Sequence, residues 1–337
     1  MTDNPVFIVD AHSDTPTDVF YRRLRGERHV LETRYVPKLK KAQVKIQVMA
    51  IYIEEQYKPH RSLEIALRQM ESLLEDLAES PSFQLITDKF DLEEVQHNDK
   101  IGIILDMEGG DPLEGGVELL YLFYRLGIRM LGITYSNRNR LADGCWETGT
   151  GGGLTSYGRE ILKHATELGM MIDVSHLAFQ GVEDVLRFAD GNVLASHCAP
   201  AAVYQSARNL SDSHIQAIAR MEGVIGMPAH PCMLSEHRAD TATVMKHIHH
   251  LVSIAGLEHV GIGADFIDIF DELIEAGIVG KEWYLPKEMA TEGYYQAEDL
   301  PGLMKTLMEN GYSGDAARKI MGANFLRFFS QSLPDRK

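Results

Sequence analysis

The sequence predicts an α/β fold, a (β/α)₈ TIM barrel, on the strength of three observations. Eight short apolar runs rich in β-branched residues recur along the 337-residue chain, and amphipathic segments follow nearly all of them. The length suits one large α/β barrel without an internal boundary. The first run is not followed by the glycine-rich turn of a nucleotide-binding open sheet. We therefore expect residues 1–337 to form a single barrel domain.

The expected strands and helices alternate in order along the chain. The strands comprise residues 6–10, 44–53, 101–106, 129–135, 171–175, 192–196, 223–228 and 259–265. The helices comprise residues 61–78, 116–126, 156–168, 178–189, 212–221 and 243–256, with 298–310 and 314–330 closing the chain. The polar and aromatic segment 267–297 follows the last strand, and we expect it to form a lid or an interface excursion.

The alternative fold is the doubly wound open sheet, which binds nucleotides at a glycine-rich turn. The turn after the first run reads "DAHSDTP" and has no glycine. The glycine cluster "GTGGGLTSYG" at 149–158 lacks both the Lys-Ser/Thr of a phosphate loop and the spacing of a dinucleotide turn. We interpret it as a loop before a helix, capped by Thr155 or Ser156.

Composition limits the partners and the compartment. A formal net charge of -16 argues against nucleic acid and anionic membranes, so the expected partner is a small molecule. Three cysteines without CxxC spacing suggest neither a disulfide framework nor a structural zinc site. The N-terminus lacks the features of a signal peptide, and no apolar run reaches the roughly 18 residues of a membrane span. We expect a cytoplasmic protein.

Polar groups stand where the expected strands end, which is where barrels of this type carry their catalytic residues. These groups are His12 and Asp14 after the first strand, Glu108 after the third, Thr134 and Tyr135 at the fourth, His176 after the fifth, His197 after the sixth, His230 after the seventh and Asp265 at the eighth. Carboxylates and imidazoles are thus expected to converge on one rim.

The His-x-Asp pair at residues 12 and 14 suggests a metal. Residues i and i+2 of a strand point the same way, so both side chains would face one point. Imidazole and carboxylate are usual ligands of catalytic Zn²⁺. Three histidines and two acids exceed the needs of one ion, which favours two ions sharing a carboxylate and holding a hydroxide between them.

Other candidates have simpler interpretations. Asp173 lies inside a strand and is expected to orient a ligand rather than to bind metal. Cys198 should point away from the metals and pack in the core. His247 and His250, in the histidine-rich segment 246–259, are expected on a solvated helix face, and His230 is left open between rim lining and packing.

Six motifs resemble those of the membrane dipeptidase (renal dipeptidase) family, the M19 peptidases. They are "DAHSDTP", "DMEGG", "DVSHLA", "ASHCAP", "SARNLSD" and "GIGADF", in the family's order and at similar separations over nearly the whole chain. The resemblance implies a zinc-dependent barrel hydrolase of dipeptides, often tolerant of a D-residue on the C-terminal side. A homodimer is compatible with it.

The resemblance also implies roles for individual residues. His12 and Asp14 would bind one zinc, His176 and His197 the other, and Glu108 would bridge both. Asp265 matches the family's catalytic acid, and Arg208 of "SARNLSD" matches the arginine that binds the substrate carboxylate. Many members have a histidine where this chain has Tyr135. A tyrosine hydroxyl can donate to an oxyanion but cannot be a cationic donor, so rate or substrate preference is expected to differ.

The expected reaction is attack of the metal-bridged hydroxide on the scissile carbonyl, with Asp265 moving the proton to the leaving amine. Tyr135 and His230 would contact the substrate, and the substrate's amine would meet rim acids such as Asp14 or Glu54. One alternative is another binuclear barrel hydrolase acting on lactones, phosphotriesters or cyclic amides. The other is a barrel that binds metal or dipeptide without turnover, for which Asp265 would have no use.

Overall fold

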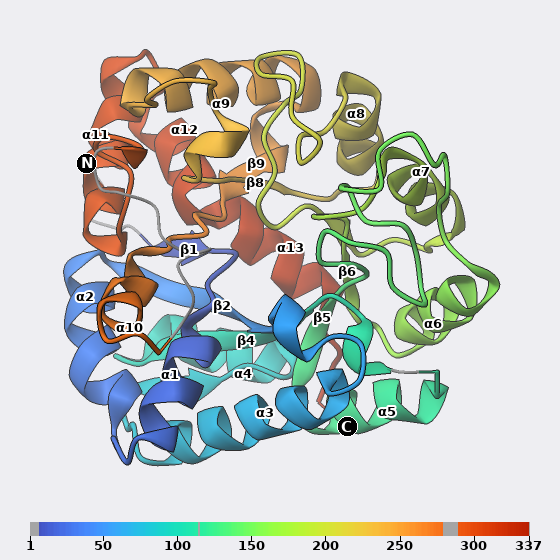
Figure 1. Cartoon of the computed structure of the whole chain (residues 1–337). Helices are drawn as coiled ribbons and strands as arrows, with labels where there is room; N and C mark the ends of the chain where they lie inside the picture. Colours follow the sequence, from blue (N-terminus) through green and yellow to red (C-terminus); the bar gives the residue numbers. More distant parts are fainter. Residues whose placement is uncertain (1–6, 114, 279–288, 337) are drawn as a thin grey trace.

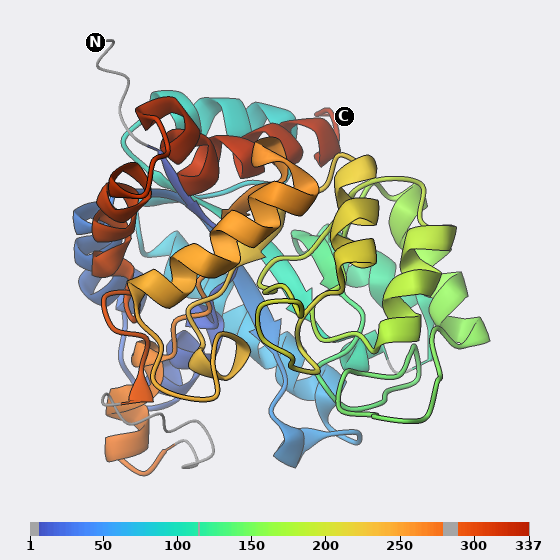
Figure 2. The same ribbon diagram turned by 90° about the horizontal axis from the view of Figure 1, so that it is seen from above.

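The computed structural model describes residues 7–113, 115–278 and 289–336. Its centre is a nearly closed barrel of parallel strands surrounded by helices, which confirms the predicted fold (Figures 1 and 2). The strands of the barrel are β1 (Ile8–Asp10), β2 (Val44–Tyr52), β4 (Ile101–Glu108), β5 (Ile128–Gly132), β6 (Met171–Asp173), β7 (Val193–Leu194), β8 (Ile225–Met227) and β9 (Val260–Ile262). All eight correspond to expected strands.

The order of the strands is β7-β6-β5-β4-β2-β1-β9-β8. A parallel bridge between Ala195 and Ile225 joins the two ends, with Gly226 N–H donating to Ala195 O at 2.8 Å. The short strand β3 (Phe83–Leu85) lies outside this ring. It pairs with Ile101–Ile103 at the start of β4, before the residues of β4 that pair with β5.

The helices follow the strands nearly as expected. Those predicted from the sequence are α3 (Ser62–Ala78), α5 (Val117–Arg125), α6 (Ser156–Glu167), α7 (Phe179–Phe188), α8 (Asp212–Arg220), α9 (Thr241–Ala255) and α11 (Leu300–Glu309). The single helix expected at 314–330 is divided into α12 (Gly314–Arg318) and α13 (Asn324–Ser332) by a π-helical turn at Lys319–Ala323. Those not predicted are α1 (Thr15–Leu24), α2 (Val36–Lys41), α4 (Lys89–His97) and α10 (Asp271–Glu275). None of the helices in the described part of the chain has the length and apolar character of a membrane span.

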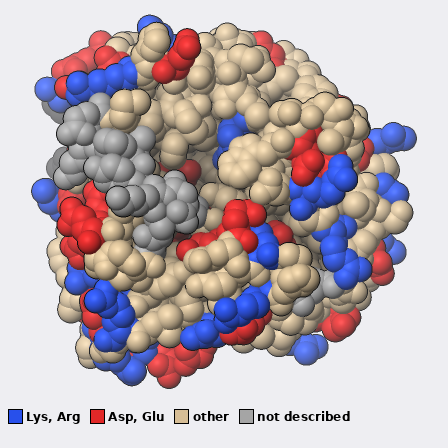
Figure 3. Space-filling model, viewed as in Figure 1, with Lys and Arg blue, Asp and Glu red and all other residues tan. Residues whose placement is uncertain are grey.

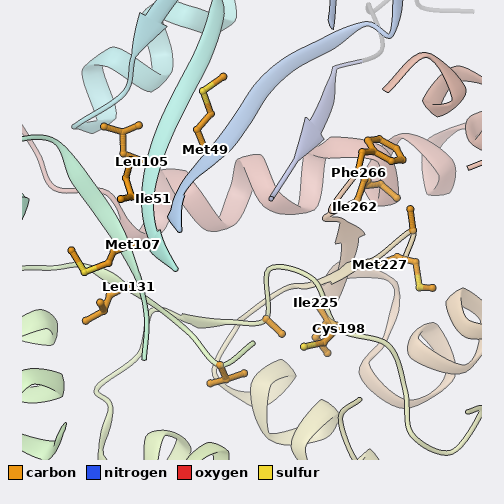
Figure 4. Close-up of a cluster of buried hydrophobic side chains, with 14 of the residues drawn as sticks. Met49, Ile51, Leu105, Met107, Leu131, Cys198, Ile225, Met227, Ile262 and Phe266 are labelled. Atoms are coloured by element: carbon orange, nitrogen blue, oxygen red, sulfur yellow. The ribbon is translucent and has the colours of Figure 1, made fainter. Parts of the chain in front are cut away.

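Successive side chains of β4 point alternately into the larger apolar core and into the barrel interior. Ile103, Leu105 and Met107 belong to the larger apolar cluster, which also contains side chains from the surrounding helices. Figure 4 shows part of this cluster, with side chains from β2, β4, β5, β8 and β9. Ile104 belongs to a second cluster with buried residues of the other strands. Because side chains in a strand alternate, Asp106 and Glu108 share the face of Ile104. Strand β4 therefore carries two carboxylates into the barrel interior.

Helix α13 closes one end of the barrel interior. Phe325, Phe328 and Phe329 pack in the same cluster as Ile104. The helix lies so close to β9 that a Cβ atom built on Gly261 would stand 2.4 Å from the ring of Phe325, which explains the glycine at this position. The carboxyl ends of the strands are left as the accessible end of the barrel.

The expected lid or interface excursion at 267–297 lies partly outside the described residues, which exclude 279–288. In the described part, Phe270 and Leu273 of the α10 region cluster with Phe20 and Tyr21 of α1. The role of this segment stays a prediction.

Candidate metal centre

Glu108 is the meeting point of the strand-end histidines. Its carboxylate is buried, and Oε1 lies 3.3 Å from Nε2 of His12, 2.9 Å from Nε2 of His176 and 3.6 Å from Nε2 of His197. Asp14 follows two residues after His12, and its Oδ1 is 3.9 Å from His12 Nε2. The structure therefore brings together all five residues expected to bind metal.

Serine hydroxyls fix the orientation of two of these imidazoles. His176 Nδ1 lies 2.7 Å from Ser136 Oγ, and His197 Nδ1 lies 2.6 Å from Ser196 Oγ. The backbone carbonyl of His176 accepts hydrogen bonds from Cys145 N–H at 2.8 Å and Thr134 Oγ1 at 3.0 Å. These contacts hold the Nε2 edge of each ring toward Glu108.

Asp173 acts on His197 through Ser196, as an orienting carboxylate rather than as a ligand. Its Oδ1 accepts from the backbone N–H of Ser175 at 3.0 Å and of Ser196 at 2.9 Å, and its Oδ2 accepts from Ser196 Oγ–H. Because the Ser196 hydroxyl donates its proton to Asp173, it accepts from Nδ1–H of His197. His197 then presents a lone pair at Nε2.

His176 also presents a lone pair at Nε2. Arg208 Nη2 lies 3.0 Å from this nitrogen, and a guanidinium can only donate. The two Nε2 atoms of His176 and His197 nevertheless lie 2.9 Å apart, and the carboxylate oxygen of Glu108 is 2.9 Å from the first. Three electron-rich atoms pointing at one another are the arrangement that a shared cation would stabilise.

Burial and charge keep the two histidines in the neutral form that metal binding requires, and they leave the two carboxylates in need of a nearby cation. Burial, and then the positive charge of Arg208, hold the pKa of His176 well below its usual range. Burial likewise lowers the pKa of His197, so both rings are neutral. Burial and the neighbouring carboxylates raise the pKa of Glu108 and of Asp14, which disfavours the ionised forms unless a cation is nearby.

The residues present fit a metal. His12 Nε2, Asp14 Oδ1 and Glu108 Oε2 are buried and have no hydrogen-bond partner among the described residues. Two sets of potential ligands have their donor atoms within 4.8 Å of one another: His12, Glu108 and His197 in one, and His12, Asp14 and Asp265 in the other. Imidazole nitrogens and carboxylate oxygens form the donor set typical of catalytic zinc. The family resemblance did not place Asp265 among the ligands, and here it lies beside them.

A cavity of about 420 Å³ opens above the carboxylates and imidazoles. Its walls are formed by Asp14, Tyr52, Glu54, Glu55, Gln56, Glu108, Tyr135, Ser136, Trp146, His176, Arg208, His230, Cys232, Met233, Asp265 and Ile267. Figure 3 shows a hollow near the middle of this view, bordered by acidic and basic side chains. All four remaining predicted site residues, Asp265, Arg208, Tyr135 and His230, therefore line the cavity.

These four residues differ in their surroundings. Oδ1 of Asp265 is 3.9 Å from His12 Nε2, and its backbone is in the left-handed region with φ 54. Arg208 contacts His176 through Nη2, while its buried Nη1 has no hydrogen-bond partner among the described residues. Burial lowers the pKa of His230. Arg208 thus presents a guanidinium to the cavity beside the candidate metal ligands.

Tyr135 lies between an imidazole and an ammonium. Its ring centroid is 4.4 Å from that of His176, and Lys58 Nζ lies 5.0 Å from the ring centroid. Burial and the nearby carboxylates raise its pKa well above the usual range, so its phenol stays protonated. Lys58 thus places a positive charge beside Tyr135, whose phenol carries none.

Sequence reasoning missed several functional neighbours. Ser136 and Ser196 orient the histidines, and Lys58 and Trp146 stand beside Tyr135 or on the cavity wall. Ser196 directly precedes His197, so its place at a strand end was a usable signal. Nothing in the local sequence indicated Lys58, because its contact with Tyr135 spans distant segments.

The histidine-rich segment lies apart from this cluster. His247 is buried, with Nε2 2.9 Å from Leu234 O, contrary to the solvated face expected for it. His250 pairs with Asp212 at 2.7 Å. Cys198 is buried, as expected, with Sγ 3.5 Å from Ser175 Oγ. His247 and His250 are therefore explained by helix packing and an ion pair.

Known proteins match this chain over nearly its whole length. The model of a family described as membrane dipeptidase, peptidase family M19, matches residues 3–334. Dipeptidase 3 of Rattus norvegicus is 25% identical over 340 residues, which cover 96% of this chain. The chain spans 64% of the length of that relative and of the Mus musculus protein of the same name.

Two solved structures share the fold. One is described as a dipeptidase and metallo peptidase of family M19, with a TM-score of 0.85, 23% identity and coverage of 98% of this chain and 99% of that chain. The other is a metallo peptidase from Rhodobacter sphaeroides liganded with a phosphinate mimic of the dipeptide L-Ala-D-Ala, with a TM-score of 0.85, 22% identity and coverage of 98% and 100%. Both likenesses confirm the barrel and extend over its loops.

Proposed function

Because the chain belongs to the membrane dipeptidase family, peptidase family M19, we propose that it is a dipeptidase holding two Zn²⁺ and hydrolysing dipeptides with a free C-terminal carboxylate. Substrates with a D-residue in second place are included, in keeping with the phosphinate mimic of L-Ala-D-Ala bound by the Rhodobacter sphaeroides neighbour. The observation that carries the proposal is the convergence of Glu108 Oε1 with the Nε2 atoms of three histidines under a cavity that Arg208 also faces.

His12 and Asp14 are proposed to hold one ion, His176 and His197 the other, and Glu108 both. Bound there, the ions would supply Lewis-acid polarisation of the scissile carbonyl and acidify the attacking water. The serine and carboxylate contacts behind the rings keep the Nε2 edges aimed at this point.

Asp265 is proposed to carry the proton. It lines the cavity next to His12, shortly after β9, the strand that pairs with β1. Its carboxylate would accept a proton from the attacking water and deliver it to the amide nitrogen of the leaving amino acid, acting first as general base and then as general acid. A protein that only binds a dipeptide has no need of this group.

Arg208 is proposed to bind the C-terminal carboxylate of the substrate. A guanidinium pairs with a carboxylate through two parallel hydrogen bonds, and Arg208 Nη1 has no partner among the described residues that such a substrate would have to displace. Tyr135, as a neutral phenol, would donate to the oxyanion, and His230 would contact the substrate from the wall.

A substrate panel tests the proposal. The zinc-loaded protein would be incubated with L-Ala-D-Ala, L-Ala-L-Ala, a lactone and a phosphotriester, and product release followed. We expect amino-acid release from the dipeptides. Turnover of the lactone or the phosphotriester without the dipeptides would assign the site to the other class of binuclear barrel hydrolase.

A further inference from the structure

An exposed tryptophan lies on the wall of the cavity. Trp146 lines the cavity, and 55% of its surface is exposed. The exposed phenylalanines in the described part of the chain each contact a neighbouring ring or cation: Phe90 and Arg336 at 4.0 Å, Phe179 and His214 at 4.3 Å, and Phe188 and Arg187 at 5.2 Å. Trp146 has no contact of this kind with any described residue. An uncovered apolar ring on a cavity wall is suited to contact a ligand.

Backbone hydrogen bonds fix the position of Trp146 relative to the metal cluster. The N–H of Trp146 donates to Ser136 O at 2.9 Å, and the N–H of the preceding Cys145 donates to His176 O at 2.8 Å. Gly144 permits this close approach, because a Cβ atom built there would stand 2.2 Å from Ser136 O. Since Ser136 also contacts the ring of His176, the segment that carries Trp146 is tied to a candidate metal ligand.

A second apolar side chain lines the cavity close to the loop of Arg208. Met233 ends the helical turn Pro231–Met233 after β8, and it lines the cavity together with Cys232. Asn209, which follows Arg208 in the chain, donates through Nδ2 to Met233 O at 2.8 Å. This hydrogen bond joins the loop that carries the guanidinium to the turn that carries Met233.

The two apolar side chains flank Arg208 in the order of the strands around the barrel. Strands β5, β6, β7 and β8 are consecutive in the closed ring, and the segments after them carry Trp146, His176, Arg208 and Met233 in that order. All four residues line the cavity, and Arg208 Nη2 lies 3.0 Å from His176 Nε2. Ligand cavities typically combine apolar walls with a few polar groups that fix the orientation of the ligand. This part of the wall has that composition.

We propose that Trp146 and Met233 form an apolar subsite for the side chain of the C-terminal residue of the substrate. The inference rests on the proposed function and deepens it, because a dipeptide whose carboxylate is bound by Arg208 carries its second side chain next to that carboxylate. The substrate class is then dipeptides with a large apolar second residue, such as phenylalanine. A larger side chain buries more apolar surface against the indole and so binds more strongly.

The test varies the size and the position of one side chain. Amino-acid release from Ala-Ala, Ala-Phe and Phe-Ala is measured with the zinc-loaded enzyme, and each second residue is supplied in both configurations so that the faster form is compared. We expect kcat/KM for Ala-Phe to exceed that for Ala-Ala about tenfold or more, which is within the range that apolar pockets reach. Trp146→Ala should lower the value for Ala-Phe about tenfold and the values for Ala-Ala and Phe-Ala less than about threefold.

Phe90→Ala is the matched control, because it removes a ring that is 52% exposed on α4 and does not line the cavity. It should leave all three kcat/KM values as in the wild type. Trp146→Phe keeps an aromatic face at the same place, and it should retain most of the preference for Ala-Phe. Bound zinc and Tm of each variant show whether the fold and the metal centre are kept.

The possible outcomes separate the inference from its premise. If the wild-type enzyme cleaves dipeptides without preferring Ala-Phe to Ala-Ala, or if Trp146→Ala changes all three substrates equally, the apolar subsite is not at Trp146 while the dipeptidase function stands. A preference for Phe-Ala that Trp146→Ala abolishes would assign the ring to the first residue and overturn the inference. If the wild-type enzyme cleaves none of the dipeptides, the proposed function fails and the inference fails with it.

Discussion

His176 Nε2 lies 2.9 Å from Glu108 Oε1, although strand β5 separates their strands β6 and β4 in the sheet. Side chains from strands that are not neighbours meet in this way because the sheet is curled into a barrel and its interior positions converge. The lone pair on His176 Nε2 faces this oxygen and the corresponding nitrogen of His197. The proposed metal centre depends on a cation shared by these three atoms.

The first prediction concerns Glu108. Glu108→Ala removes the carboxylate that, among the described residues, lies within 3.6 Å of all three ring nitrogens, so the variant should retain less zinc per chain than the wild type after dialysis. Metal content measured by atomic emission on purified protein checks this. Retention of the wild-type amount would contradict the bridging assignment.

Ser196 is predicted to increase the affinity for metal by orienting His197. Ser196→Ala removes the hydroxyl that links His197 Nδ1 to Asp173. Loss of such an orienting contact typically weakens metal binding about 10–100-fold. Zinc affinity from competition with a chelating dye measures the effect. Ser253→Ala, which removes an exposed hydroxyl bonded to His250 O, serves as the control and should bind zinc as the wild type does.

Asp265→Asn should separate proton transfer from substrate binding. The amide keeps the size of the side chain but cannot accept the proton, so kcat and kcat/KM should fall together by roughly 10²–10⁴-fold. Steady-state kinetics with L-Ala-D-Ala provide the readout. A change confined to KM would show that Asp265 only binds the substrate.

Arg208→Met should remove selectivity for a free C-terminus. The wild type should cleave L-Ala-D-Ala and spare its C-terminal amide, whereas the variant should cleave the free acid poorly and lose most of the difference between the two. The ratio of kcat/KM values is the measured quantity. Arg238→Met is the control, since Arg238 pairs on the surface with Glu292 at 3.0 Å; an equal loss in both variants would argue against the carboxylate role.

Acid stability should depend on Glu79. Hydrogen bonds from Arg23, the backbone of His29 and Arg28 lower the pKa of Glu79 from 4.5 to about 2. The ionised carboxylate therefore stabilises the fold above pH 4.5, and this contribution is lost as the pH falls toward about 2. Urea unfolding of metal-free protein should show Glu79→Gln less stable than wild type at pH 7, with the difference shrinking by pH 3. A difference independent of pH would exclude this linkage.

The sequence was sufficient for the barrel because its strands are short, apolar and regularly spaced. It failed for β3 and α1. The three residues of β3 are too few to show a period, and α1 begins at Thr15 immediately after Asp14, inside the segment interpreted as a turn. The packing of α1 against distant segments, such as Tyr21 on Glu54, is a property of the folded chain only.

The residues of the site could be predicted from the sequence where they follow an expected strand. His12, Glu108, His176, His197 and Asp265 each follow an apolar run, and the structure gathers them. Arg208 stands in a loop without such a signal, and only the family resemblance suggested it. Contacts such as Lys58 over Tyr135 join segments 77 residues apart, which no local pattern indicates.

A zinc titration of chelator-stripped protein, with alanine release from L-Ala-D-Ala followed at each addition, shows whether the cluster around Glu108 holds the metal that activity requires. We expect negligible activity without metal and a rise in step with bound zinc that ends at about two equivalents. Full activity of the stripped protein, or failure to take up zinc, would contradict it.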